Sequence, residues 1–148
     1  MKIPNRIKFL LLVGLQFLFI LLLLSGSPLN NIPLLAYAFI ILSLLFILWA
    51  IITMQKSKLR IMPEPSVDAT LVTTGPYRFI RHPMYTAILL GCIGLLIDQF
   101  TLVRLAMVVA LAIVLFIKLS WEEKMLSEKF GGYSDYMKQT SRLIPFLF

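Results

Sequence analysis

Long apolar runs constrain the fold of this chain more than any other feature. They cover about residues 7–24, 32–54, 84–97 and 101–120. Hydrophobic residues make up 59% of the 148 positions, more than a water-soluble domain can hide, since roughly a third of a chain's surface stays exposed after folding. In a bilayer each run must be a helix, because unpaired backbone groups cannot face hydrocarbon. We therefore predict an all-α integral membrane protein, one domain over 1–148, with about four transmembrane helices.

The third run is short for a membrane crossing. At a rise of 1.5 Å per residue, about fifteen residues reach ~22 Å, against a hydrocarbon core of ~30 Å. Either this helix starts deep in the membrane, or it forms a tight hairpin with the fourth run through Asp98-Gln99-Phe100. Gly91 and Gly94 predict close packing of this helix against a neighbour.

Basic residues predict the orientation in the membrane. All but one of the 14 Lys and Arg residues flank the runs on one side, and Arg104 is the exception. Cytoplasmic loops carry the excess of Lys and Arg, so both termini and a tail over 121–148 are expected in the cytoplasm. The first run is expected to be a retained helix, since it is longer than the apolar part of a signal peptide. Topology explains the net charge of +7, and nucleic acid is not an expected partner.

The segment between the second and third runs is unusually rich in basic and aromatic residues: Gly75-Pro76-Tyr77-Arg78-Phe79-Ile80-Arg81-His82-Pro83-Met84-Tyr85. His82, the single histidine, precedes a proline and is biased away from helical geometry, whereas Pro83 suits the first helical position. Free N–H groups at a helix start attract anions, and Arg78 and Arg81 add charge-assisted donors. Such residues also commonly anchor a helix at the membrane surface and do nothing more.

Two adjacent carboxylates, Glu122 and Glu123, follow the fourth run. Neighbouring residues on a helix point about 100° apart, so at most one of them is expected to face a shared site. One interpretation is a solvated helix surface with weak Glu–Lys pairs. The other is a carboxylate beside the basic segment, suited to a ribose diol, an ammonium or a sulfonium. The lone histidine and the single cysteine form no metal-binding spacing, and no metal site is predicted.

The joint spacing of these motifs resembles that of the isoprenylcysteine carboxyl methyltransferases and the related phospholipid methyltransferases. The resemblance covers about residues 71–145. It is carried by Gly75-Pro76-Tyr77-Arg78-x-x-Arg81-His82-Pro83-x-Tyr85, Glu122-Glu123-x-x-Leu126, Phe130-Gly131-x-Tyr133-x-x-Tyr136 and Arg142-x-x-Pro145. Ala87 departs from the family pattern, which commonly has glycine there.

The resemblance implies a membrane enzyme that uses S-adenosylmethionine to methylate a lipid or prenylated small molecule. It implies a cofactor site on the cytoplasmic side, completed by the tail and formed by Tyr77, Arg78, Arg81, His82, Pro83, Tyr85, Glu122 and Glu123. Arg81, Glu122 and Glu123 are the catalytic candidates, and Tyr136 and Arg142 are candidates for substrate binding. Two alternatives stay open, an NADPH-dependent reductase of the membrane sterol type and a non-catalytic protein with the same fold. The methyl acceptor, carboxylate or amine, and the oligomeric state are not specified by the sequence.

Overall fold

The computed structural model describes residues 5–25, 32–55 and 70–145, and these form an all-helical bundle. The elements are α1 (Asn5–Ser25), α2 (Leu34–Gln55), the 3-10 helix η1 (Gly75–Arg78), α3 (Pro83–Asp98), α4 (Leu102–Lys129) and α5 (Tyr133–Gln139). Within the described ranges the one β pairing is an isolated parallel bridge between Ile80 and Ser141. The predicted all-α class is confirmed.

Three of the described helices are long and apolar enough to cross a membrane, at Ile7–Ser25, Leu34–Gln55 and Leu102–Lys129. The helix α3 has 16 residues and is shorter than a full crossing. It meets α4 after the short connection Gln99–Thr101, so the hairpin alternative is the one observed. Most large apolar side chains of α1 and α2 point outward, as expected where lipid is the solvent. The chain is an integral membrane protein.

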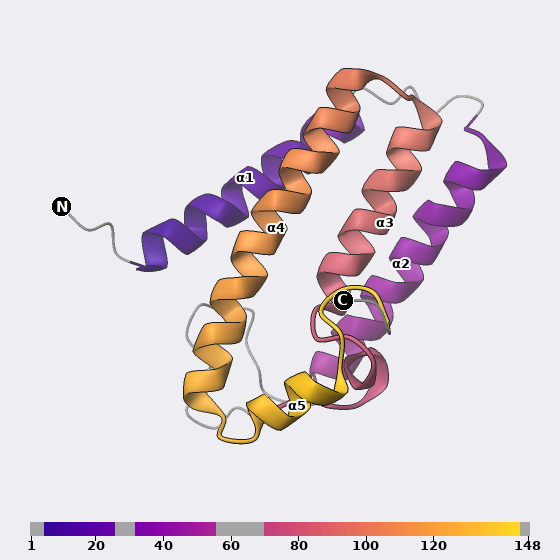
Figure 1. The fold of residues 1–148 in the computed structure, drawn as a ribbon. Coiled ribbons are helices and arrows are strands. Elements are labelled where there is room, and N and C mark those ends of the chain that lie inside the picture. The colour runs from indigo at the N-terminus through magenta and orange to yellow at the C-terminus, as the bar shows by residue number, and fades with distance from the viewer. Residues whose placement is uncertain (1–4, 26–31, 56–69, 146–148) are drawn as a thin grey trace.

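The long helices run alongside one another, with α3 between α2 and α4 (Figure 1). The helix α1 packs mainly on α4 and touches α3. Gly94 permits the close approach of α3 to α2, because a Cβ atom there would lie 3.1 Å from the carbonyl oxygen of Ala36. The hydroxyl of Ser43 donates a hydrogen bond of 2.7 Å to the carbonyl of the fully buried Ala87. The predicted close packing of α3 against a neighbouring helix through its glycines is confirmed.

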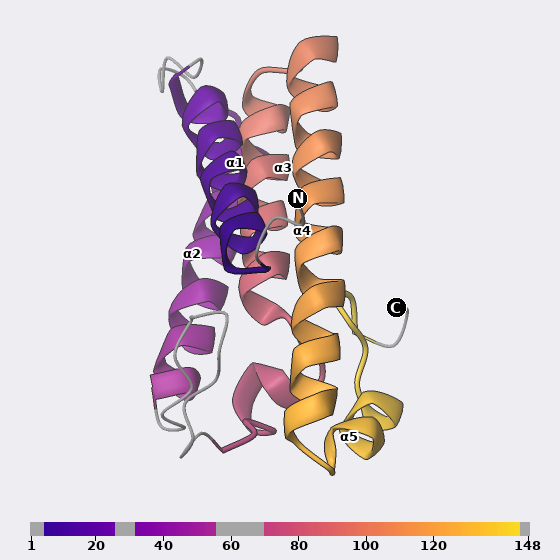
Figure 2. The same cartoon turned by 90° about the vertical axis from the view of Figure 1, so that its left-hand side faces the viewer.

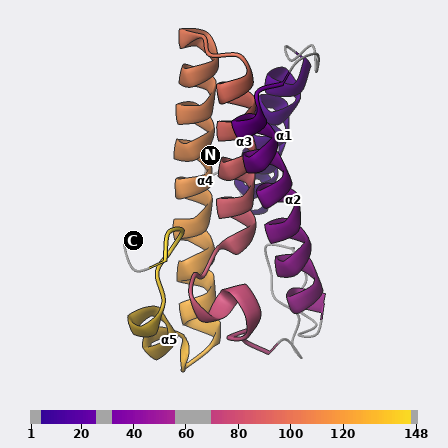
Figure 3. The same cartoon turned by 90° about the vertical axis from the view of Figure 1, so that its right-hand side faces the viewer.

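The helix α4 continues without a break to Lys129, nine residues beyond the predicted end at position 120. The boundary predicted at position 120 separates a membrane span from a cytoplasmic tail, and it stays a prediction. Glu122 and Glu123 belong to the long helix. Lys118, counted above among the flanking charges, is buried inside α4. The next helix, α5, is capped by Gly132. Figures 2 and 3 show η1, α5 and the end of α4 gathered at one end of the bundle.

Several residues on which the predicted orientation depends lie outside the described ranges. They are Lys2, Lys56, Lys58 and Arg60. Within those ranges, the ammonium of Lys8 lies 5.8 Å from the ring centre of Trp121. This contact places the beginning of α1 near the same end of the bundle as the two glutamates.

Candidate functional site

The basic segment is held in place by backbone pairing with the chain that follows α5. The N–H of Arg81 donates to the carbonyl of Ser141 at 2.8 Å, and the N–H of Ser141 donates to the carbonyl of Phe79 at 3.1 Å. The N–H of His82 donates to the carbonyl of Arg142 at 3.1 Å. Gly75 starts the preceding turn at a φ of 59°, which disfavours a residue with a Cβ atom. Residues about sixty positions apart therefore form one rigid frame.

Glu123 is the centre of an ion-paired cluster inside this frame. Its Oε1 accepts a hydrogen bond of 2.6 Å from Nε of Arg81, and its Oε2 lies 3.1 Å from Nε of Arg142. Nη1 of Arg81 also donates to the carbonyls of Met137, at 3.1 Å, and Thr140. The side chains of Arg81 and Glu123 are 7% and 5% exposed. Buried charges of this kind are stable only when paired and hydrogen-bonded, as they are here.

His82 lies between the two glutamates. Its Nδ1 is 3.6 Å from Oε2 of Glu122, and its Nε2 is 3.5 Å from Oε1 of Glu123. The imidazole stacks on the ring of Tyr85 with a centroid separation of 5.4 Å, and the hydroxyl of Tyr85 donates to Oε1 of Glu122 at 2.5 Å. The prediction that at most one glutamate faces the site is wrong, because the two ring nitrogens of His82 meet one carboxylate each.

The remaining candidate residues differ in their burial and in their contacts. Pro83 begins α3, as predicted, and is buried. Tyr77 is also buried, and burial, followed by the charge of Glu122, raises the pKa of its phenol to about 12. The hydroxyl of Tyr136 donates to the carbonyl of Tyr77 at 2.7 Å, so it supports the frame. The side chain of Arg78 is exposed and makes no hydrogen bond or ion pair with any other residue that the structure describes.

The open part of the cluster is a carboxylate, and two N–H groups of the helix start at which an anion was predicted are already bonded within the protein. The N–H groups of Tyr85 and Thr86 are already bonded to the carbonyl of His82, and the side chain of Glu122 remains 25% exposed. Oη of Tyr77 is buried and has no hydrogen-bond partner among the described residues, and Nε2 of His82 has only the 3.5 Å contact with Glu123. Buried polar atoms without a partner are costly, and a polar ligand would satisfy them.

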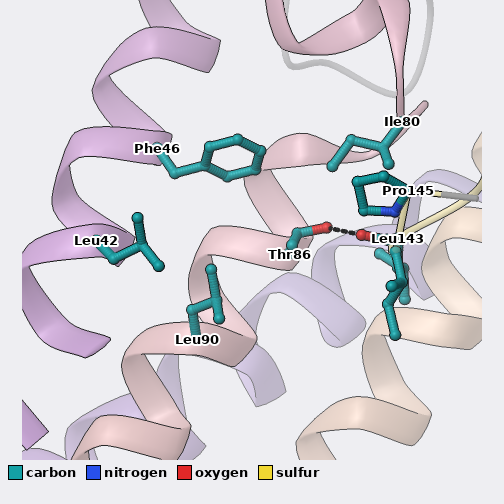
Figure 4. A pocket seen from close by; sticks show the side chains of 8 residues that line it. Leu42, Phe46, Ile80, Thr86, Leu90, Leu143 and Pro145 are labelled. Atoms are coloured by element: carbon teal, nitrogen blue, oxygen red, sulfur yellow. Dashed lines mark hydrogen bonds between the residues drawn. The ribbon is translucent and has the colours of Figure 1, made fainter. Parts of the chain in front are cut away.

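An apolar cavity of about 420 Å³ is lined by neighbours in sequence of the cluster residues, although no side chain of the cluster itself lines it. Its walls come from α2, α3 and the segment after Arg142: Leu42, Phe46, Ile80, Thr86, Leu90, Leu143, Ile144 and Pro145. Thr86 donates a hydrogen bond of 2.7 Å to the carbonyl of Leu143, which fixes the C-terminal segment against α3 (Figure 4). Because Ile80 precedes Arg81 and Leu143 follows Arg142, the cavity and the cluster share their backbone walls. This cavity was not predicted from the sequence, although Thr86 lies one turn after His82.

Metal binding is not apparent in the part of the chain that the structure describes, where no group of three or more His, Cys, Asp or Glu side chains is arranged to hold an ion.

Comparison with known proteins identifies the family. The family model for phospholipid methyltransferases matches residues 32–132. The chain belongs to this family. The match includes α2, η1, α3 and α4, and therefore both the basic segment and the paired glutamates of the cluster. It leaves α1 and α5 outside.

Two curated relatives of the chain are named as metal resistance proteins. They are the cobalt-zinc-cadmium resistance protein CzcN of Cupriavidus metallidurans, 33% identical over 77 residues, and the nickel-cobalt-cadmium resistance protein NccN of Alcaligenes xylosoxydans xylosoxydans, 37% identical over 79 residues. Each alignment covers 51% of this chain and 36% of the relative. The aligned part is thus about one third of each relative's length.

The fold also matches a solved methyltransferase. The eukaryotic intramembrane Ras methyltransferase ICMT, an isoprenylcysteine carboxyl methyltransferase, aligns with a TM-score of 0.62 and 25% sequence identity. The alignment covers 98% of this chain and 55% of that protein. The four long helices and the C-terminal segment therefore share the arrangement of a membrane methyltransferase.

Proposed function

We propose that the protein is an S-adenosylmethionine-dependent methyltransferase that acts on a lipid-like acceptor within the membrane. The observation that carries the proposal is the cluster of Arg81, His82, Tyr85, Glu122 and Glu123, which lies at one end of apolar helices and shares its walls with an apolar cavity. Family membership and the fold of the Ras methyltransferase support the same reaction class.

The residues present fit such a cofactor. It carries a positive sulfonium, an adenine ring and ribose hydroxyls. Glu122 has an exposed carboxylate edge for the hydroxyls or the cation, and Tyr77 offers a buried ring with an unpartnered hydroxyl. Nε2 of His82 makes no hydrogen bond among the described residues beyond its 3.5 Å contact with Oε1 of Glu123. When bound, the cofactor supplies a methyl group on sulfur, which a nucleophile takes as the neutral thioether leaves.

The chain's own residues serve mainly to position the reactants. Glu123 holds Arg81 and Arg142 together. Arg81, just before α3, also bonds the carbonyl of Met137 in α5 and that of Thr140 directly after it. Fixing reactants in one geometry contributes much of the rate in such reactions. Glu122 is the carboxylate with an open side, and for an amine acceptor it would be the group placed to remove a proton. We assign contact with the reactants to Glu122, positioning of the site to Arg81 and Glu123, and substrate contacts to Arg142.

The apolar cavity supports a lipid-like acceptor. The walls described above are apolar except for Thr86, whose hydroxyl is already bonded to Leu143, so the space suits hydrocarbon and would not hold a polar molecule well. Its walls reach α2 and α3 within the apolar part of the bundle (Figure 4). A chain lying there would bring its headgroup toward the cluster. The orientation in the membrane rests on a separate observation, the excess of basic residues at one end of the apolar runs. From it we propose that the cluster and both termini lie on the cytoplasmic side.

Label transfer tests this function. Membranes from cells that produce the protein are incubated with methyl-labelled S-adenosylmethionine, and the label in the extracted lipid is counted. Wild type is expected to label lipid above membranes that lack the protein, and Arg81→Met is expected to abolish the increase. Arg78→Met is the matched control, because that arginine is exposed and outside the cluster. Lipid labelling that is equal in all four samples would refute the proposal.

A further inference from the structure

Lys118 is a buried cation in the apolar part of α4, and the proposed chemistry does not use it. The residue is 5% exposed. It lies four positions before Glu122, so both side chains project from the same face of α4. A charged side chain at this depth is costly and usually marks a functional position.

The ammonium of Lys118 is surrounded by groups from α1 and α3. Its Nζ donates a hydrogen bond of 3.2 Å to Oε1 of Gln16, and it lies 5.1 Å from the ring centre of Phe9 and 5.0 Å from that of Tyr85. An ammonium has three N–H donors. Among the described residues, no carboxylate lies within ion-pairing distance of it. One amide and two ring faces surround the ammonium, and they leave donors for another acceptor.

Arg104 is a second buried cation of α4, and its guanidinium donates hydrogen bonds to oxygen atoms of the protein itself. It is 7% exposed. Its Nη2 donates to the carbonyl of Leu23 at 2.5 Å, and its Nη1 donates to Oε1 of Gln99 at 3.4 Å. It lies fourteen residues from Lys118, or about 21 Å along the helix. Arg104 is thus a matched control for the removal of a buried positive charge from α4.

Tyr85 connects Lys118 to the cluster. One face of its ring meets the ammonium, and its hydroxyl donates to Glu122. Lys118 and the ion-paired cluster together carry three cations, Lys118, Arg81 and Arg142, and two carboxylates, Glu122 and Glu123, which leaves one positive charge in excess. A bound sulfonium adds a second. An acceptor with a negative group compensates this excess, whereas an ammonium would be repelled by it.

We propose that Lys118 determines acceptor specificity by binding the anionic headgroup of the lipid, a carboxylate or a phosphate, beside Tyr85. The proposal rests on the methyltransferase function above. In the absence of an acceptor, Gln16 holds the ammonium, and the anionic group replaces this neutral partner. Hydrogen bonds to charged groups are worth enough to favour an anion over a neutral or cationic headgroup by about tenfold or more.

A headgroup series tests the proposal. Purified protein in neutral detergent is titrated with a long-chain alkyl carboxylate, an alkyl phosphate and an alkylamine of equal chain length, and affinity is measured from thermal stabilisation. Wild type is expected to bind at least one of the two anions about tenfold more tightly than the amine. The stronger of the two anions identifies the headgroup source. Equal affinity for all three probes, or a preference for the amine, would overturn the proposal.

Variants assign the preference to Lys118. In Lys118→Met the anion preference is expected to disappear, and in Lys118→Arg and Arg104→Met it is expected to persist. If Lys118→Met fails to fold, Gln16→Glu answers the same question, because it places a carboxylate against the ammonium and neutralises it without deleting the lysine. A preference that survives in Gln16→Glu or Lys118→Met would refute the assignment.

Parallel titrations with and without S-adenosylhomocysteine separate this proposal from the proposed function. Loss of cofactor binding with an intact anion preference would contradict only the methyltransferase function. Cofactor binding without an anion preference would contradict only the role of Lys118.

Discussion

Replacement of Glu123 by glutamine tests whether the cluster is the structural centre of the site. Glutamine has nearly the same shape but no charge, so Glu123→Gln leaves Arg81 and Arg142 facing each other without a carboxylate between them. The amide oxygen can still accept one hydrogen bond, from Nε of Arg81. The amide nitrogen then faces the guanidinium of Arg142 and offers it no acceptor.

The magnitude follows from the burial of these groups. Breaking a buried ion pair by removing one partner costs about 3–5 kcal/mol. The retained neutral hydrogen bond to Arg81 returns about 1 kcal/mol, and Arg142 is 30% exposed, so water compensates part of its loss. We expect Glu123→Gln to lower the unfolding free energy by about 2–3 kcal/mol, and the melting temperature by on the order of 5–10 °C for a domain of this size.

The assay is thermal unfolding in detergent, followed by intrinsic fluorescence or by circular dichroism. Glu128→Gln is the matched control, because Glu128 lies on the same helix with an exposed side chain and its change is expected to stay within about 0.5 kcal/mol. If Glu123→Gln melts no lower than Glu128→Gln, the ion-paired cluster does not stabilise the fold and the reasoning fails.

Three further predictions concern single side chains. Tyr85→Phe removes the hydroxyl that donates to Glu122 and is expected to weaken the binding of S-adenosylhomocysteine about tenfold in calorimetry; unchanged affinity would exclude this pair from the site. Gly94→Ala places a Cβ atom 3.1 Å from a backbone carbonyl of α2 and should destabilise the bundle by about 1–3 kcal/mol, whereas Gly14→Ala meets open space and should not. Finally, the unfolding free energy should fall as the pH rises above about 10, because the phenol of Tyr77 loses its proton near 10 when unfolded and near 12 when folded; Tyr77→Phe should flatten this slope in pH-dependent denaturation.

The helices that cross the membrane could be predicted from the sequence because lipid imposes a simple rule on apolar runs. That rule locates the point where a helix leaves the membrane and not the point where the helix ends. The stretch from Trp121 to Lys129 is polar, yet it is composed of residues that favour helix, and α4 continues through it. The helix α4 therefore extends nine residues beyond the apolar run that predicts its membrane span.

The residue types of the cluster could also be predicted, but the contacts between them could not. The bridge between Ile80 and Ser141 is a tertiary contact between segments that share no local pattern. The helical angle between Glu122 and Glu123 argued against a shared site, because it ignored the ring of His82 lying between them. Lys118 was counted as a flanking charge, since the sequence does not show which face of α4 packs against α1.

The most direct test of the central claim is calorimetric titration of the purified protein with S-adenosylhomocysteine in detergent. We predict one binding site with a dissociation constant in the micromolar range, lost in Arg81→Met and retained in Arg78→Met, and no comparable binding of NADPH. Failure of folded wild-type protein to bind S-adenosylhomocysteine, or equal binding by both arginine variants, would contradict the account.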